Sequence, residues 1–315
     1  MSATPIDIAD LRFVGSDLAR PECVLATRAG DLYCSDRRGG VTRIAPDGAQ
    51  TLFGDAPITP NGVAMLRDRS FLVSNLADSG GVWRVTRKGT VEPFVTEIDG
   101  VALGPVNFVW LDDRERVWLC VSTTRKGEAV YNKDIRDGFV AVKDSRGTRV
   151  VAQDLCFTNE CRIDPSGRYL YVNETFGQRV TRFRVSDMAD LTDRATLTEF
   201  GPGMFPDGMA IDSEGALWVV GVIANRLIRV MFGGKQTVML DDPDPRLMEF
   251  DALHRANKLT RPMLSATRGK VLGNISSIAF GGADLKIAYL GCLNGDRLAT
   301  FRSPVAGLPP VHWDW

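Results

Sequence analysis

The chain has 315 residues, of which 44% are hydrophobic and 24% are charged, and its formal net charge is −1. These values are ordinary for a globular protein with an apolar core. Because no long basic run occurs, the composition argues against nucleic-acid binding through phosphate contacts. No stretch approaches the ~18 apolar residues of a membrane span. Residues 1–15 also lack a basic region followed by an apolar segment, so we expect a cytoplasmic protein with no membrane partner.

Six short β-favouring runs recur along the chain, and each follows a turn rich in Asp, Gly, Ser or Arg. After each run comes a segment in which apolar and polar residues alternate, as in a strand with one buried face. In the first five units a further short run follows. The repeated β-favouring runs are residues 31–36, 70–75, 116–122, 169–174, 216–221 and 287–292. The sequence is therefore built from six copies of one unit, with the spacing of about 40–50 residues that propeller blades have.

The sixth unit ends without a fourth strand of its own, and residues 11–15 supply a candidate for it. Their sequence, LRFVG, resembles the fourth runs TLFG and TEFG of other units. Four strands per unit, six units and closure by the N-terminal strand predict an all-β fold, a six-bladed β-propeller that forms a single domain over residues 1–315. A β-sandwich or a pair of β-domains would not explain why the chain begins with a fourth strand.

Three segments fall outside the repeat. An insert at 122–137 lengthens one connection of the third unit. A second insert, at about 241–273 between units five and six, contains helical spacing within 246–259. Long connections on a rigid scaffold often shape a binding pocket. The tail, 305–315, is expected on the flank of the barrel or against a second subunit, and the oligomeric state stays open.

The innermost strands of a propeller line a central channel, and the residue that enters each strand can face the channel mouth. Counting back eleven or twelve residues from the landmark of each second strand reaches an oxygen-bearing side chain in the first five units. In the sixth unit the matching place falls near Ser277, with Ser276 and Asn274 close by. Asn and Asp also suit turns that enter strands, but Glu does not. The six positions are Glu22, Asn61, Asn107, Asn159, Asp207 and Ser277.

Two carboxylates, Glu22 and Asp207, would converge at this mouth, and their repulsion calls for a compensating cation. A divalent ion balances both charges, and amide oxygens complete an all-oxygen shell that suits a hard cation. We therefore expect one divalent metal, with Ca²⁺ favoured over Mg²⁺, Mn²⁺ and Zn²⁺. No Cys or His stands at these positions, which argues against a soft-ligand zinc site.

Several of these segments resemble the regucalcin and gluconolactonase family and, more distantly, diisopropylfluorophosphatases and paraoxonases. The resemblance covers about residues 10–304 and rests on ARPECVLAT, TPNGVAML, GPVNFVWLDDRERVWLCVSTT, TNECRIDPSGRYLYVNET and FPDGMAIDSEGALWV. It implies a six-bladed propeller with a catalytic divalent metal held by Glu22, Asn159 and Asp207. It also implies that Asn107 is a further ligand or contacts the substrate.

The ring and the resemblance together favour hydrolysis of a small lactone or ester. The metal would polarise the carbonyl group and a carboxylate would take a proton from water. Asp207 is the first candidate for this base and Glu160 is the second. Many family members have Gly where this chain has Glu160, so Glu160 could instead recognise the substrate or only pair with Arg162. The other candidate substrate contacts are Asn107, Asn61, which matches no family ligand, and Arg136 in the first insert.

Other chemistries have less support from the sequence. No Gly-x-Ser-x-Gly elbow of a serine hydrolase occurs. The chain has only two histidines, His254 in the second insert and His312 in the tail, and both are expected at the surface or in the tail. A non-catalytic propeller that binds calcium or another ligand is one alternative. A metal hydrolase of the phosphotriesterase type is the other, because the same ring would serve it.

Overall fold

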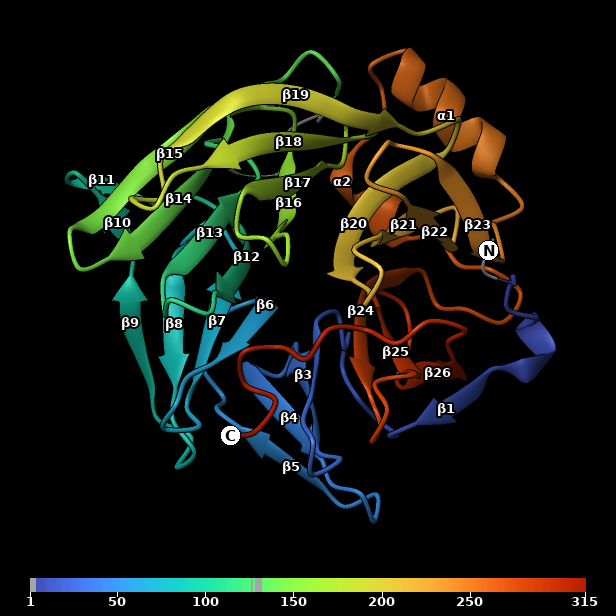
Figure 1. Cartoon of the computed structure of the whole chain (residues 1–315), viewed down its shortest axis with the longest axis horizontal. Coiled ribbons are helices and arrows are strands. Elements are labelled where there is room, and N and C mark those ends of the chain that lie inside the picture. The colour runs from blue at the N-terminus through green and yellow to red at the C-terminus, as the bar shows by residue number, and fades with distance from the viewer. Residues whose placement is uncertain (1–3, 126, 128–131) are drawn as a thin grey trace.

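A computed structural model describes residues 4–125, 127 and 132–315 of the chain. In this part of the chain, six sheets of four antiparallel strands are arranged in a ring around a central axis (Figure 1). The predicted fold class, a six-bladed β-propeller, is therefore confirmed. A small additional sheet of β10 (Glu97–Ile98) and β11 (Val101–Ala102) lies between the second and third blades in the chain.

Within each of the first five blades the strands are adjacent in chain order, so each blade is an antiparallel meander whose first strand is the innermost. Blade 1 contains β2 (Val24–Ala26), β3 (Leu32–Asp36), β4 (Gly40–Ile44) and β5 (Gln50–Phe53). Blade 2 contains β6 (Pro60–Met65), β7 (Phe71–Asn75), β8 (Val82–Val85) and β9 (Val91–Val95). Blade 3 contains β12 (Val106–Leu111), β13 (Val117–Val121), β14 (Gly138–Asp144) and β15 (Gly147–Leu155). Blade 4 contains β16 (Thr158–Ile163), β17 (Tyr169–Glu174), β18 (Arg179–Val185) and β19 (Leu191–Glu199). Blade 5 contains β20 (Met204–Ile211), β21 (Leu217–Ile223), β22 (Arg226–Val230) and β23 (Gln236–Asp241).

The sixth blade is made from both ends of the chain. Its strands are β24 (Ile275–Gly281), β25 (Ile287–Cys292), β26 (Leu298–Arg302) and β1 (Arg12–Val14), which follows the short helix η1 (Ile8–Asp10). In the antiparallel pair of β1 and β26, Arg12 lies opposite Thr300 and Val14 lies opposite Leu298. The predicted closure by the N-terminal strand is thus confirmed, and it ties the two ends of the chain into one ring.

A buried carboxylate organises the turn before the second strand in blades 3 and 5. Asp112 accepts a hydrogen bond of 2.9 Å from Nε1 of Trp118. Asp212 accepts one of 2.9 Å from Nε1 of Trp218 and another of 2.6 Å from Nε of Arg229. Both tryptophans are fully buried between sheets. These two landmarks of the repeat are therefore core residues whose polar atom is satisfied by an Asp of the preceding turn.

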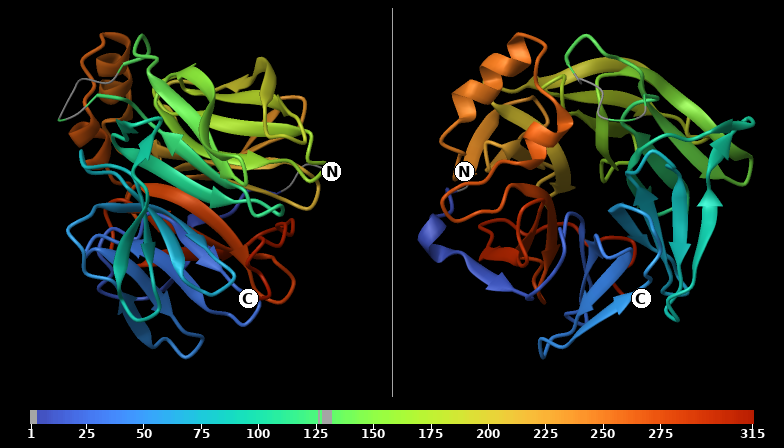
Figure 2. Two further views of the ribbon diagram at one scale, coloured as in Figure 1. Left: turned by 90° about the vertical axis from the view of Figure 1, so that its left-hand side faces the viewer. Right: turned by 180° about the vertical axis from the view of Figure 1, so that it is seen from behind.

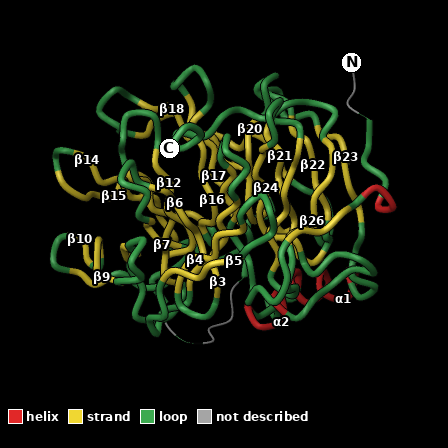
Figure 3. Tube along the Cα trace, turned by 90° about the horizontal axis from the view of Figure 1, so that it is seen from below, coloured by secondary structure: helices red, strands yellow, loops and turns green. Residues whose placement is uncertain are grey.

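The second insert and the C-terminal tail lie on opposite faces of the ring (Figures 2 and 3). The insert forms two helices, α1 (Leu247–Arg255) and α2 (Arg261–Ser265), where the sequence predicted one within 246–259. The second residue of α2 is a Pro, which suits the first turn of a helix. None of the described helices combines the length and the apolar character needed to cross a membrane.

The tail covers one end of the central tunnel, where residues 308–312 line a cavity. Its backbone is held there by hydrogen bonds from Leu308 to Ile211 (3.1 Å) and from Arg28 to Trp313 (2.9 Å). The prediction that the tail packs on the barrel flank is therefore wrong, because the turns at this face offer free backbone groups that the tail satisfies.

Both histidines are buried, so a surface position is wrong for His254, whereas His312 lies in the tail as expected but is buried there. His254, in α1, is 4% exposed and packs edge-on against Phe205, with ring centroids 5.0 Å apart. His312, in the tail, is 6% exposed. Neither lies in a loop open to solvent, because α1 and the tail each turn one apolar side toward the propeller.

Candidate metal centre and active site

A β-bulge accompanies the entry residue of five inner strands. In β6, β12, β16, β20 and β24 the register with the next strand shifts at this residue. A bulge leaves a residue unpaired and re-aims its side chain, a device that is common beside active sites. In blade 6 the shift spans Ser276, so the register assigns the ring position to this neighbour of the predicted Ser277. The entry residues within the shifts are Asn61, Asn107, Asn159, Asp207 and Ser276.

Hydrogen bonds join the entry residues of blades 1 to 3. Nδ2 of Asn61 lies 3.0 Å from Oε1 of Glu22, 2.8 Å from the carbonyl oxygen of Asn107 and 3.1 Å from Oδ1 of Asn107. All three side chains are buried. The structure thus brings these three sequence-predicted residues together at one end of the tunnel.

The entry residues of blades 4 and 5 form a second group. Nδ2 of Asn159 donates to Oδ1 of Asp207 and, at 3.0 Å, to Oγ1 of Thr175. Nδ2 of Asn173 donates to the carbonyl oxygen of Asp207 at 2.7 Å, and Oγ1 of Thr175 donates to the carbonyl oxygen of Pro206 at 2.8 Å. The second strand of blade 4 and the turn after it therefore hold the bulge of β20, which fixes the Asp207 carboxylate.

Two buried oxygen atoms of the entry residues have no hydrogen-bond partner among the described residues: Oε2 of Glu22 and Oδ1 of Asn159. Leaving a buried acceptor without a partner costs about 1–3 kcal/mol. Both atoms are hard oxygen donors, the kind that Ca²⁺ and Mg²⁺ prefer. In the described part of the chain no group of three or more His, Cys, Asp and Glu residues is placed to hold a metal. The ring fits a hard cation because its two carboxylates are supplemented by amide oxygens.

Both carboxylates of the ring have raised pKa values. Burial is the main cause of the raised pKa of Glu22, and the negative charge of Asp207 is the next. Burial also raises the pKa of Asp207 to about 7, together with repulsion from Glu160. The charge of Asp207 in blade 5 thus acts on Glu22 in blade 1. A cation between them would remove this repulsion and favour the ionised form of both.

Arg20 belongs to the same group, although sequence reasoning did not select it. Its Nη1 donates to Oδ1 of Asn61 at 2.9 Å, and its positive charge lowers the pKa values of Glu22 and Asp207. Burial in turn lowers the pKa of Arg20. The guanidinium compensates only one of the two ring carboxylates, so a net negative charge stays at the mouth. The sequence carries no signal for this role, because a loop arginine four residues before a strand is usually solvated.

Glu160 lies beside Asn159 but turns toward Arg162. Oε2 of Glu160 forms an ion pair of 3.0 Å with Nη2 of Arg162 and accepts a hydrogen bond of 3.1 Å from the backbone N–H of Met209. Burial raises the pKa of Glu160, and the Arg162 charge opposes this rise. The guanidinium of Arg162 lies over Phe108, 4.6 Å from the ring centroid. The structure thus contains the pairing of Glu160 with Arg162, which was one of the interpretations of Glu160 that the sequence allowed.

Arg136 is exposed, and no hydrogen bond or ion pair joins it to the entry residues within the described residues. Its charge acts on the thiol of Cys156, whose pKa is raised by burial. The neighbouring Asp137 accepts a hydrogen bond of 2.9 Å from Thr123, which anchors the end of the first insert. Part of that insert, residues 126 and 128–131, lies outside the described residues. The structure therefore does not bring Arg136 to the ring.

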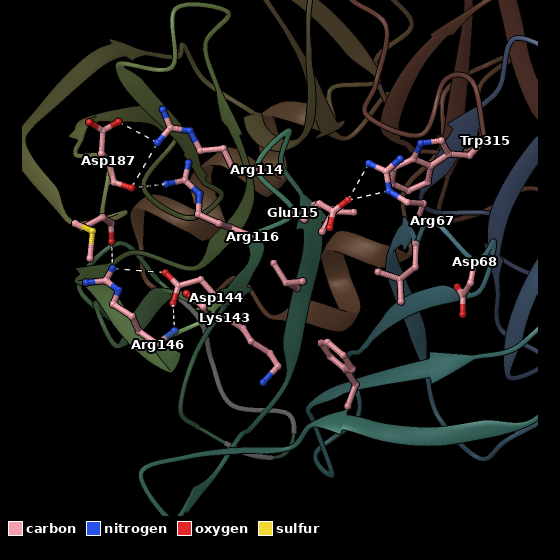
Figure 4. A pocket seen from close by; sticks show the side chains of 16 residues that line it. Arg67, Asp68, Arg114, Glu115, Arg116, Lys143, Asp144, Arg146, Asp187 and Trp315 are labelled. Atoms are coloured by element: carbon pink, nitrogen blue, oxygen red, sulfur yellow. Dashed lines mark hydrogen bonds and ion pairs between the residues drawn. The ribbon is translucent and has the colours of Figure 1, made fainter.

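A separate hollow of about 650 Å³ lies among basic and acidic side chains of blades 2 to 4 (Figure 4). Its arginines already have acidic partners: Nη1 of Arg114 lies 2.9 Å from Asp187, and Nη2 of Arg67 lies 2.8 Å from Glu115. These pairs are exposed, and exposed ion pairs contribute little. The arginines of the hollow are thus matched by surface carboxylates, in contrast to the buried and unmatched oxygens of the ring.

The chain belongs to the family described as the SMP-30/Gluconolactonase/LRE-like region, whose model matches residues 20–248. The matched segment contains Glu22, Asn61, Asn107, Asn159 and Asp207, the entry residues of the first five blades.

Solved structures share the fold at low sequence identity. A gluconolactonase from Xanthomonas campestris is 18% identical with a TM-score of 0.70, and the match covers 96% of this chain and 98% of that one. A luciferin-regenerating enzyme is 15% identical with a TM-score of 0.70 over all of both chains. Regucalcin from Agrobacterium tumefaciens, a calcium-binding protein, is 13% identical with a TM-score of 0.66, covering 100% of this chain and 95% of that one. At these identities the likeness establishes the propeller fold.

Proposed function

We propose that this protein is a metal-dependent hydrolase of a small lactone or ester. The observation that carries the proposal is the pair of buried carboxylates, Glu22 and Asp207, at one end of the tunnel beside hydrogen-bond acceptors that lack partners. Two buried carboxylates with raised pKa values weaken a fold unless they bind something positive. The family supports a lactonase-like activity on a small molecule.

The residues that would hold the ion are Glu22, Asn159 and Asp207, with Asn107 as a further ligand. They offer oxygen donors only, which favours Ca²⁺ over Mg²⁺, Mn²⁺ and Zn²⁺. A bound divalent ion would polarise the carbonyl group of a lactone or ester and stabilise the charge that develops on its oxygen.

The remaining steps fall to side chains of the chain itself. Asp207 is our first candidate for the base that takes a proton from the attacking water, because its position is fixed by Asn159 and by the backbone bond from Asn173. Glu160 is the second candidate, and its ion pair with Arg162 makes it the less available base. Asn61 and Asn107 would orient the substrate through their amide groups.

The test is a panel of substrates with the metal as a variable. The full-length protein, stripped with EDTA, is assayed on glucono-1,5-lactone, a γ-lactone, an aryl ester and a phosphotriester, with and without added Ca²⁺, Mg²⁺, Mn²⁺ or Zn²⁺. We expect lactone or ester turnover that requires a divalent ion. In Asp207→Asn we expect turnover to fall at least ~100-fold, the size of a lost acid–base group.

Asp47→Asn is the matched control, because Asp47 is an exposed turn residue. A folded Asp207→Asn variant with full turnover would remove Asp207 from the mechanism. Faster turnover of the phosphotriester would favour the phosphotriesterase alternative. Metal-dependent stabilisation without turnover on any member of the panel would favour a non-catalytic binding propeller.

A further inference from the structure

The part of the tunnel between the ring and the C-terminal tail is lined by a different set of side chains. Three residues after each entry residue, the inner strands place another set of side chains, and all of them line a cavity of about 410 Å³. In a regular strand, positions three apart face opposite sides, but the bulge at the entry residue adds one residue and brings them to the same side. The set consists of Leu25, Ala64, Trp110, Arg162, Ala210 and Ala279.

The strand register supports this equivalence. Ala64 lies opposite Leu72, Trp110 opposite Trp118 and Ala279 opposite Tyr289. Each partner is the landmark residue of the second strand in its blade. Because all six blades contribute the same position, the cavity lies on the tunnel axis, and residues 308–312 of the tail complete its wall at the outer end.

Every arginine of the cavity wall has an acidic partner: Arg114 pairs with Asp187 at 2.9 Å and Arg116 with Asp112 at 2.6 Å, and Asp113 and Asp164 also line the wall. Arg162 is the cation of the second set, and Glu160 compensates it at 3.0 Å. Its guanidinium lies over two aromatic rings, 4.6 Å from the centroid of Phe108 and 5.7 Å from that of Trp110. The other members of the set are apolar. A wall of this kind favours an uncharged ligand with a flat apolar body.

His312 adds one unmatched hydrogen-bonding atom to this wall. It is 6% exposed, lines the cavity, and its Nε2 has no hydrogen-bond partner among the described residues. The imidazole also forms a hydrogen bond to the backbone of Ala26, and burial keeps it neutral. A neutral imidazole that donates to a backbone carbonyl through one nitrogen presents a lone pair on the other. The cavity therefore offers one acceptor for an N–H or O–H group.

We propose that this cavity is a second ligand site, separate from the ring, for a neutral aromatic compound with one hydroxyl or N–H donor. The volume is ample, since an apolar cavity of about 150 Å³ takes up benzene. The aromatic body packs against Trp110, Leu25 and Ala279, and the donor meets Nε2 of His312. The site does not depend on the proposed hydrolase activity, because no ring carboxylate takes part in it.

The test uses 2-naphthol as a probe and 2-methoxynaphthalene as a matched probe without a donor. Binding to the full-length protein is followed by calorimetry or by probe fluorescence. We expect saturable binding of one 2-naphthol per chain and about tenfold weaker binding of 2-methoxynaphthalene, the effect of one lost hydrogen bond. In His312→Phe the two probes should bind with equal affinity, because the acceptor is gone.

A second variant tests the location without touching His312. Ala279→Phe fills the cavity from β24 and should abolish binding of both probes, while Ala49→Phe, at an exposed turn, should leave it unchanged. Binding in the presence of EDTA and in Asp207→Asn should equal that of the untreated protein.

Three results would overturn the inference: no saturable binding, binding that survives Ala279→Phe, or binding that EDTA removes. The last would place the probe at the ring. Loss of lactone turnover in Asp207→Asn with intact naphthol binding would separate the two sites, whichever substrate the ring takes.

Discussion

At the scale of single residues, the buried ring carboxylates would favour the proposed metal binding at the expense of stability. Without a cation, Glu22 is repelled by Asp207 and Glu160 and is attracted by Arg20 alone among these charges. We predict that Glu22→Gln raises the stability of the EDTA-treated protein by about 1 kcal/mol, or about 2 °C in melting temperature, because one buried charge is removed. Glu115→Gln, at an exposed site, is the control, and differential scanning calorimetry gives the comparison. A clear loss of stability in Glu22→Gln would mean that Arg20 already stabilises this charge.

His312 gives a pH dependence of known sign. Burial lowers its pKa from 6.5 to about 4 in the folded protein. A base with a lowered folded-state pKa contributes its full stability above the unfolded-state pKa, and this contribution is lost as the pH falls from about 6.5 toward 4. We predict that, over this range, the wild type loses up to about 3 kcal/mol of unfolding free energy relative to His312→Phe. Urea unfolding at a series of pH values measures it, and a difference that does not change with pH would show that His312 titrates normally.

At the scale of elements, the Asp–Trp pairs show how blades 3 and 5 fix the turn that precedes their second strand. Asp212 is fully buried, and its carboxylate accepts hydrogen bonds from Trp218 (2.9 Å) and Arg229 (2.6 Å). Asp212→Ala leaves both donors buried without a partner, so we predict a loss of about 3–5 kcal/mol in the free energy of unfolding. Asp187→Ala removes an exposed ion pair with Arg114 and should change it by less than about 1 kcal/mol. Equal effects in urea unfolding would contradict this account of the blades.

The elements also explain which parts of the ring the sequence could predict. The repeat of turn, strand and landmark is local, so counting back from the landmark reached Asn61, Asn107 and Asp207 without any knowledge of the sheet. Counting was less accurate in blade 6, where Ser276 and not Ser277 lies in the bulge. β24 runs five residues past its bulged residue, whereas β6, β12, β16 and β20 run four past theirs, and only the strand register resolves such a difference.

At the scale of the whole molecule, the sequence predicted the ring of six blades and its closure but not what covers its two ends. The closure followed from a pattern shared by residues 11–15 and the other fourth strands. The positions of Arg20, of α2 and of the tail depend on contacts between segments far apart in the chain, which no local pattern encodes. For this reason the sequence alone revealed neither the Arg20 guanidinium at the mouth nor the second cavity of the tunnel.

The central claim is that side-chain oxygens from separate blades bind one divalent cation on the propeller axis. Isothermal titration calorimetry of the EDTA-stripped protein with Ca²⁺ tests it most directly. We predict one site per chain in the wild type and in Asp47→Asn, and loss of that site in both Asp207→Asn and Glu22→Gln. No heat of binding in the wild type, or a site that both ring variants retain, would contradict the account.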